Sequence, residues 1–383
     1  MPIRSWDIFC TVIDNFGDIG VCWRLARQLA QEHGHAVRLW VDDLGSFARL
    51  APEIDATRPS QRLGGVEVHA WDPQAGAPFD APVPHDVVIE AFACHLPEPF
   101  LAAMAAAPRK PVWINLEYMS AEDWVAEHHG MNSPHPRLPL VKYFFFPGFA
   151  HGTGGLLRES MIGASRDAFR DSAAAHATLW HRLGVQPMRD SLKVSLFAYT
   201  NPVMTALLEQ WRDGSTRIEC FVPQGPAATQ IEQWLGASLA PGSTHHRANL
   251  VVHGIPFVRQ EHYDELLWAC DVNFVRGEDS CVRAHWAARP MIWQIYPQDD
   301  NAHHVKLDAW LQRFGRAGVS PEASAALTAF SHAWNGYGAT PDWASLQAQL
   351  PALNAGMDRW QRQLQHLGDL AANLVAFSEN QVK

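Results

Sequence analysis

The opening of the chain changes from a continuous apolar run to a helical pattern within about thirty residues. Residues 8–13 are all apolar or β-branched, which is typical of a strand buried on both faces of a parallel sheet. Further on, Val21, Leu25 and Leu29 recur at every fourth position, with Arg24 between them. This spacing predicts a helix whose apolar side packs on the sheet.

The loop between this strand and this helix carries two carboxylates, Asp14 and Asp18, together with Gly17 and Gly20. A strand, loop and helix in this order place the loop at the carboxyl edge of the sheet. Open α/β sheets bind their ligands at that edge. We therefore expect Asp14 and Asp18 to lie in a ligand-binding site.

Further apolar runs predict more strands in the first half of the chain. They cover residues 35–41, 65–71, 86–92, 111–116 and 142–150. Asp42 and Asp43 follow the first of these runs, Glu117 follows the fourth, and Glu90 lies near the end of the third, so acidic side chains are expected along the ligand edge. Glu90 and Glu117 could instead cap helices. Asp42 and Asp43 could hold a ribose, although the first turn lacks the GxGxxG pattern of dinucleotide folds.

The aromatic run at residues 142–150 is followed by a glycine-rich segment at 151–155. Such a segment is expected to be flexible and could cover a ligand, whereas the phenylalanines could simply pack in the core. Residues 164–183 form an alanine-rich pattern that predicts one helix leading into a second domain.

The second half repeats the same alternation of strands and helices. Predicted strands cover residues 192–199, 217–223, 249–253 and 271–275, with a helix at 263–269. We therefore expect an α/β chain of two domains. The first covers residues 1–183 and the second residues 184–355, and a single C-terminal helix at 356–383 packs back on the first domain.

The segment Arg276 to Ser280 follows a strand and precedes a predicted helix at 281–288. With Asp279 or Ser280 as N-cap, the first backbone N–H groups of that helix would point at a bound diphosphate. Arg276 or Arg283 would add positive charge. An ordinary helix cap with surface ion pairs is the alternative. Residues 293–301 are predicted to form a strand that ends in a proline loop and a polar, acidic cluster, and both loops are expected to face a cleft opposite Asp14 and Asp18.

Composition narrows the class of protein. Of 383 residues, 47% are hydrophobic and 18% are charged, which indicates a folded chain with ample core material. The net charge of -10 disfavours nucleic acid as a partner. The six cysteines form no CxxC pair and are expected to be reduced core thiols, and the 20 histidines show no metal-ligand spacing. No signal or membrane segment is visible, so a cytoplasmic protein that does not bind membranes is expected.

Several motifs together resemble the bacterial elongation factor P arginine rhamnosyltransferase family. They are IDNFGDIGV at 13–21, NLEYMSAE at 115–122, KYFFFPGF with TGGLLRE at 142–159, IPFVRQ at 255–260, and VRGEDSCVRA with QIYPQDDN at 275–301. The resemblance covers nearly the whole chain in order. It implies a GT-B glycosyltransferase of two Rossmann-like doubly wound domains facing a cleft. The implied reaction moves L-rhamnose from dTDP-β-L-rhamnose to an arginine of elongation factor P, with inversion and without a metal or other cofactor.

The resemblance also implies roles for individual residues. Asp18 matches the family's general base, Asp14 its partner, and Glu278 an acidic residue needed for activity. Phe257 matches the aromatic residue that stacks on thymine, and Gln260 matches a contact to the base. The implied nucleotide and diphosphate contacts are Tyr199, Arg276, Asp279 and Ser280. Arg259 departs from the family pattern, in which a proline stands directly before the glutamine.

Two alternatives remain open from the residues alone. One is a GT-B enzyme with a different sugar nucleotide or a small-molecule acceptor, because a diphosphate site says little about base or sugar. The other is a non-catalytic module of the same fold, which paired carboxylates opposite an anion site disfavour.

Overall fold

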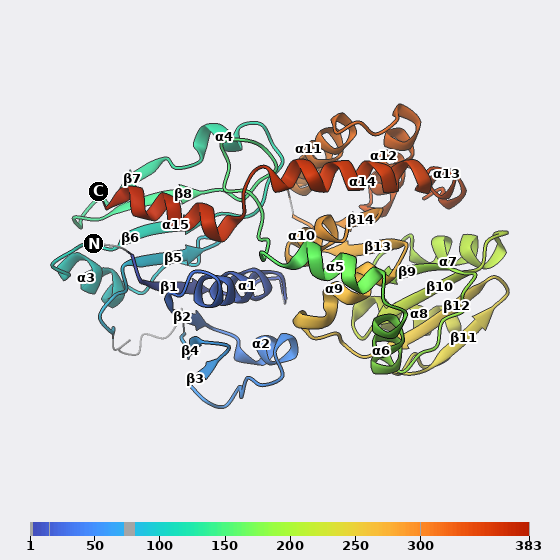
Figure 1. The fold of residues 1–383 in the computed structure, drawn as a ribbon, viewed down its shortest axis with the longest axis horizontal. Coiled ribbons are helices and arrows are strands. Elements are labelled where there is room, and N and C mark those ends of the chain that lie inside the picture. Colours follow the sequence, from blue (N-terminus) through green and yellow to red (C-terminus); the bar gives the residue numbers. More distant parts are fainter. Residues whose placement is uncertain (1–2, 15, 73–80, 299, 383) are drawn as a thin grey trace. The chain divides into compact units, whose positions relative to one another are not determined.

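Each half of the chain forms a twisted, mainly parallel sheet with helices on both faces (Figure 1). The computed structural model describes residues 3–14, 16–72, 81–298 and 300–382. Asn15 and Asp299, which belong to two of the motifs above, lie outside the described residues. The chain divides into two units, residues 1–160 with 364–383 and residues 161–363.

The first unit has an eight-stranded sheet. Its strands are β1 (Ser5–Cys10), β2 (Ala36–Val41), β3 (Ser60–Leu63), β4 (Val66–Ala70), β5 (Val87–Ala91), β6 (Val112–Leu116), β7 (Asn132–Pro134) and β8 (Val141–Phe145). Its helices are α1 (Gly17–Gln31), α2 (Leu44–Leu50), α3 (Glu98–Ala106), α4 (Val125–His128) and α15 (Leu370–Gln381). The parallel strands lie in the order β4-β2-β1-β5-β6-β8, which is the doubly wound order, and β3 and β7 pair antiparallel at the two edges.

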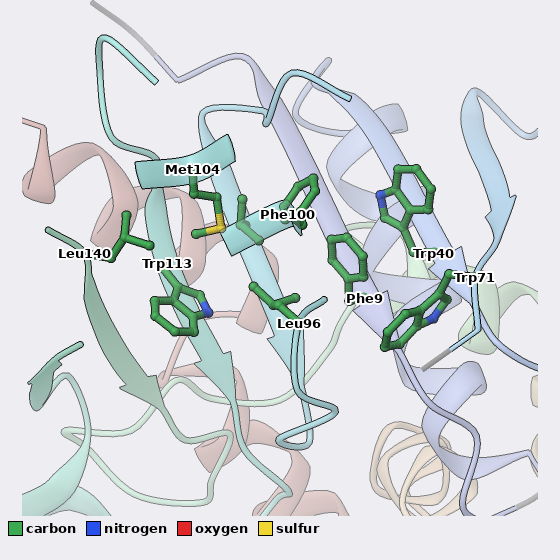
Figure 2. Close-up of a cluster of buried hydrophobic side chains, with 9 residues drawn as sticks. Phe9, Trp40, Trp71, Leu96, Phe100, Met104, Trp113 and Leu140 are labelled. Carbon is green, nitrogen blue, oxygen red and sulfur yellow. The ribbon is translucent and has the colours of Figure 1, made fainter. Parts of the chain in front are cut away.

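A cluster of large side chains fills one face of this sheet (Figure 2). The ring of Phe9 on β1 stacks on Trp40 of β2 at 5.4 Å between centroids and meets Phe100 of α3 edge-on at 4.8 Å. Alternate residues of β1 point to the opposite face, where α1 packs. Helices therefore bury both sides of β1 and fix the direction of the loop that follows it.

The second unit has a six-stranded sheet. Its strands are β9 (Leu192–Leu196), β10 (Ile218–Pro223), β11 (Thr244–Arg247), β12 (Leu250–Ile255), β13 (Val272–Arg276) and β14 (Met291–Gln294). Its helices are α5 (Ile162–Arg170), α6 (Ala173–Leu183), α7 (Met204–Asp213), α8 (Pro226–Leu235), α9 (Gln260–Ala269), α10 (Asp279–Ala287), α11 (Ala302–Arg316), α12 (Pro321–Trp334), α13 (Trp343–Ala348) and most of α14 (Leu350–Gln365). The parallel strands lie in the order β12-β10-β9-β13-β14, and β11 pairs antiparallel with β12 at the edge. The chain adds β10 and β12 on one side of β9 and then β13 and β14 on the other side, so the strand order reverses between β9 and β13.

The two predicted long helices are each two helices in the structure. The pattern at 164–183 breaks between α5 and α6, where the side chain of Ser172 caps α6 by accepting from the Ala175 N–H. The predicted helix at 356–383 breaks at Gly368, whose φ of 82° is left-handed, and so divides into α14 and α15. The structure assigns α5 and α6 to the second unit, and the Arg166 guanidinium of α5 donates to the Trp286 carbonyl oxygen of that unit.

The glycine-rich segment has a packing role, in contrast to the expected flexible cover. A Cβ atom at Gly154 would lie 2.4 Å from a ring carbon of Phe145. The carbonyl oxygen of Gly154 accepts from the Asn373 side chain of α15 at 3.0 Å. The close approach of the chain to an aromatic ring requires glycine here.

The structure bears on two further expectations. All six cysteines lie within the described residues, and each is a free thiol, with five of them buried. The expected core position is confirmed for these five, whereas Cys94 is only partly buried. Within the described ranges, none of the helices has the length and apolar character that a membrane span requires.

Candidate functional site

Asp18 lies in the first turn of α1 and is 1% exposed. Its Oδ2 atom accepts hydrogen bonds from the backbone N–H groups of Ile13 and Asp14, both at 2.8 Å. The predicted strand at 8–13 ends at Cys10, because the N–H groups of Val12 and Ile13 bind side chains rather than a neighbouring strand. The loop folds around the Asp18 carboxylate.

Asp42 holds the same loop from β2. Its Oδ1 accepts from the Val12 N–H at 2.9 Å, and burial raises the pKa of Asp42. Asp43 caps α2 by accepting from the Ser46 N–H, and a second hydrogen bond, from the Ser46 hydroxyl, lowers the pKa of Asp43. Both acidic residues thus hold backbone in place, which is a structural role rather than the ribose contact weighed above.

Asp14 is half-buried beside Asp18. The Gly17 N–H donates to the Asp14 carbonyl oxygen at 2.7 Å, which closes a tight turn. A Cβ atom at Gly17 would lie 2.8 Å from Oδ2 of Asp14. The glycine therefore leaves room for the carboxylate, and both carboxylates lie in one short loop at the carboxyl end of β1.

Tyr118, which sequence reasoning missed, also reaches this loop. It follows β6, and its hydroxyl donates to Oδ1 of Asp18 at 3.0 Å. Its ring stacks on Phe92 at 4.3 Å between centroids. Phe92 and its neighbours Ala93 and His95 have φ angles of 55–57°, a left-handed conformation that costs about 1–2 kcal/mol per residue.

Glu90 and Glu117 do not cap helices. Glu90 is 1% exposed and accepts from the Trp113 indole N–H at 3.0 Å, while Lys142 lies 3.3 Å from its Oε2. Glu117 accepts from Asn115 and lines a cavity of about 270 Å³. Glu90 thus belongs to a buried polar network, and Glu117 lines a cavity.

In the second unit, the Arg276 guanidinium lies against two aromatic rings. Its central carbon is 4.4 Å from the Phe197 ring centroid and 4.5 Å from that of Tyr199. Arg276 is 5% exposed, and its Nη1 donates to the Ala198 carbonyl oxygen at 3.4 Å. The cation is therefore held at the end of β13, beside the chain that leaves β9.

Helix α10 starts at Asp279 with Glu278 as its N-cap, so neither predicted N-cap is the observed one. Ser280 does not cap, because its hydroxyl accepts from the Arg276 N–H at 2.9 Å and donates to the Arg276 carbonyl oxygen. Gly277 has a φ of 60°, which brings the chain round between β13 and α10. The first backbone N–H groups of α10 lie directly after this turn.

Gln260 and Phe257 lie in the segment that enters α9. The Gln260 side-chain amide donates to Oδ2 of Asp279 at 3.3 Å, and the Phe257 ring meets Phe197 edge-on at 6.4 Å. Arg259 has a φ of -55° and a ψ of 145°. These angles are also those of a proline, so the backbone conformation suits either residue.

Arg283, considered above as a diphosphate contact, is 1% exposed and binds Asp264 with two hydrogen bonds of 2.7–2.8 Å. It joins α10 to α9. The six predicted donor-site residues lie around the carboxyl ends of β9 and β13, where the strand order reverses. They are Tyr199, Phe257, Gln260, Arg276, Asp279 and Ser280.

Glu278 belongs to this second unit, and Asp14 and Asp18 to the first. Phe197, which contacts both Arg276 and Phe257, was missed. Its spacing of two from Tyr199 is the signal that could have identified it.

Comparisons with known proteins identify relatives of this chain. It matches the family model described as "Elongation-Factor P (EF-P) rhamnosyltransferase EarP" over residues 6–379. It is 48% identical to the protein-arginine rhamnosyltransferase of Pseudomonas putida over 378 residues, 98% of this chain and 99% of that protein. Identity to the Pseudomonas aeruginosa protein of the same name is 47%, over 98% of this chain and 99% of the relative.

Solved structures give the same relationship. One described as "Structural basis for EarP-mediated arginine glycosylation of translation elongation factor EF-P" has a TM-score of 0.69 and 35% identity, covering 98% of this chain and 99% of the other. MurG of Acinetobacter baumannii shares only the fold, at a TM-score of 0.51 and 12% identity, over 99% of this chain and 100% of that one. The match over nearly its whole length means that the chain belongs to the EarP family of protein-arginine rhamnosyltransferases and has the GT-B glycosyltransferase fold.

Proposed function

We propose that this enzyme transfers L-rhamnose from dTDP-β-L-rhamnose to an arginine side chain of elongation factor P, with inversion at the anomeric carbon. The observation that carries the proposal is the pair of carboxylates, Asp14 and Asp18, in one loop at the carboxyl end of β1. Two adjacent carboxylates repel a phosphate but suit a guanidinium, which offers five N–H donors in a planar fork.

The second unit supplies the donor half of the reaction. Phe257 stacks on the thymine base and Gln260 contacts it, while Tyr199, Arg276, Asp279 and Ser280 surround the nucleotide and its diphosphate. The buried Arg276 guanidinium and the first N–H groups of α10 support this assignment, because both stabilise an anion. Glu278 accepts hydrogen bonds from sugar hydroxyls. The donor set uses no metal ion or other cofactor.

Arginine is a difficult nucleophile. A guanidinium has a pKa near ~13 and a carboxyl group near ~4, so complete proton transfer before attack would cost roughly 12 kcal/mol. We infer that Asp14 and Asp18 bind the cationic guanidinium and aim one of its nitrogens at the anomeric carbon. Because the guanidinium is bound and oriented as a cation, it does not have to lose a proton before it attacks.

Proton transfer then accompanies bond formation. The nitrogen lone pair forms the bond to the anomeric carbon, and the bond from that carbon to the diphosphate oxygen breaks. The departing electron pair stays on the dTDP oxygen, which Arg276 and the start of α10 stabilise. The nitrogen loses its proton to Asp18 as it becomes acidic.

Intact mass spectrometry of elongation factor P tests this function. Incubation with the enzyme and dTDP-L-rhamnose should add one deoxyhexose, located on an arginine by fragmentation. Asp18→Asn should bind the donor normally but lower kcat by at least about 100-fold, in the range of a lost general base.

Asp55→Asn is the matched control, because Asp55 is exposed at a turn of the same unit, and its kcat should be parental. An unchanged acceptor mass would contradict the proposed reaction. Transfer from UDP-glucose but not from dTDP-L-rhamnose would favour a GT-B enzyme with another donor. An Asp18→Asn variant with parental kcat would remove Asp18 from the mechanism.

A further inference from the structure

The hydrogen bonds of Asp18 distinguish its two carboxylate oxygens. Oδ2 accepts from two backbone N–H groups, those of Ile13 and Asp14, whereas Oδ1 accepts from the Tyr118 hydroxyl. A carboxylate has about four acceptor positions, two on each oxygen. Donors from the described part of the chain thus fill both positions of Oδ2 and one of Oδ1. Within the described residues, the position left for a substrate proton is therefore on Oδ1.

Tyr118 controls where that position points. Both oxygens move together when the carboxylate turns about its Cβ–Cγ bond, so the two backbone bonds to Oδ2 limit that rotation from one side. The hydrogen bond from Tyr118 at 3.0 Å opposes this rotation. The orientation of the reacting oxygen therefore depends on a residue one hundred positions away in the sequence.

Tyr118 is itself held in place. Its ring lies nearly parallel to that of Phe92, with 13° between the planes, and Phe92 is 7% exposed. The Phe92 N–H donates to the Leu116 carbonyl oxygen at 2.7 Å, and the Ala93 N–H donates to the Asn115 side chain. These bonds attach the left-handed turn after β5 to the end of β6, two residues before Tyr118.

We propose that Tyr118 is a positioning residue that orients Oδ1 of Asp18 toward the acceptor guanidinium, with Phe92 as its support. This inference rests on the proposed role of Asp18 as the base. Tyr118 remains protonated throughout, because its hydroxyl donates to Oδ1 while the guanidinium proton takes the other position on the same atom. It acts through Asp18 and binds neither substrate.

Tyr118→Phe tests the inference, because it removes the hydroxyl and keeps the ring on Phe92. We expect kcat to fall about 10- to 100-fold, the range of a hydrogen bond to a charged group, with KM for donor and acceptor within about two-fold of parental. Tyr143→Phe is the matched control, since Tyr143 lies on β8 of the same unit and packs on Phe377. Its kcat should be unchanged.

A double variant separates this inference from the proposed function. In the Asp18→Asn background, with slow turnover followed by acceptor mass, adding Tyr118→Phe should change the rate by less than about two-fold. An equal loss in both backgrounds would mean that Tyr118 acts independently of Asp18, and a parental kcat for Tyr118→Phe would overturn the inference directly. If Asp18→Asn itself is fully active, the proposed base is wrong, whatever Tyr118 does.

Unfolding temperatures of all variants exclude loss of fold as the cause. Should Tyr118→Phe unfold at the assay temperature, Phe92→Leu keeps the hydroxyl and removes only the stacked ring. It should lower kcat by about three-fold or more without changing either KM. A parental kcat for Phe92→Leu would remove Phe92 from the proposal.

Discussion

His285 is a buried histidine whose hydrogen bonds require a neutral ring. Nδ1 lies 2.7 Å from the Cys281 carbonyl oxygen and donates to it, and Nε2 accepts from the Trp310 indole N–H at 2.9 Å. A proton on Nε2 would face the indole proton. Burial lowers the pKa of His285 to about 4.

This histidine makes the second unit sensitive to acid. Between pH 6.5 and about 4 the unfolded chain takes up a proton at His285 and the folded chain does not, so the free energy of unfolding falls as pH falls. The full loss is roughly 3 kcal/mol at ~1.36 per pKa unit. Denaturant unfolding from pH 7 to 4.5 should show the stability advantage of the parent over His285→Gln shrinking.

His181→Gln provides the control, since His181 is exposed on α6. Its stability difference from the parent should stay constant over the same pH range. A His285→Gln difference that is equally constant would contradict the assignment.

At single positions, sequence analysis identified the residues that follow strands and missed those that act through distant contacts. Asp14 and Asp18 were identifiable because a strand, a loop and a helix follow one another within 25 residues. Tyr118 was not, because its hydrogen bond to Asp18 depends on β6 lying beside β5 and β5 beside β1. The neighbouring Glu117 was selected instead, because it is acidic and follows the same predicted strand.

Among the elements, the buried parallel strands were predictable and the antiparallel edge strands were not. Hydrophobic runs marked β1, β5 and β13, whereas β3, β7 and β11 have the sequences SQRL, NSP and THHR, which are polar. Antiparallel pairing to one neighbour forms these edges, and no local pattern encodes it. The breaks in the two long helices depend on single residues, Ser172 and Gly368.

Helices α9 and α10 are joined by the buried pair of Asp264 and Arg283. Asp264→Asn would remove the carboxylate that binds the buried Arg283 charge with two hydrogen bonds, so we expect a loss of about 3–5 kcal/mol in the free energy of unfolding. Because α9 and α10 carry Gln260 and Asp279, dTDP binding should weaken as well. Chemical denaturation and calorimetric titration with dTDP measure the two effects.

Glu265→Gln tests the neighbouring position on the same helix. Glu265 pairs with the partly exposed Arg182, and its loss should cost less than about 1 kcal/mol. If both substitutions lowered the free energy of unfolding equally, burial of the Asp264–Arg283 pair would add nothing to its contribution.

In the whole molecule, the first unit is built from two separate stretches of chain. Gln28 on α1 donates to Asp369, the N-cap of α15, at 3.1 Å, and the Leu370 N–H donates to the Leu156 carbonyl oxygen. The Phe377 ring packs on Phe145 at 5.4 Å. Helix α15 therefore completes the core of the first unit.

Fragments should differ accordingly. Residues 161–363 should fold alone and unfold cooperatively. Residues 1–160 should be weakly stable until a peptide of residues 364–383 is added, which should raise their unfolding temperature in a concentration-dependent way. Circular dichroism melts measure both.

A peptide carrying Leu370→Asp and Phe377→Ala is the control and should have no effect, because it lacks the packed side chains. A fragment 1–160 that is as stable alone as with the native peptide would contradict an integral role for α15.

The split first unit imposes an order on biosynthesis. About 200 residues separate its two stretches, and ribosomes add ~5–20 residues per second, so the strands made first wait roughly 10–40 s for α15. The surface around Phe145 and Leu156 stays open to the solvent or to a chaperone during that time. The nascent enzyme thus completes the unit of residues 161–363 before the unit that holds Asp14 and Asp18.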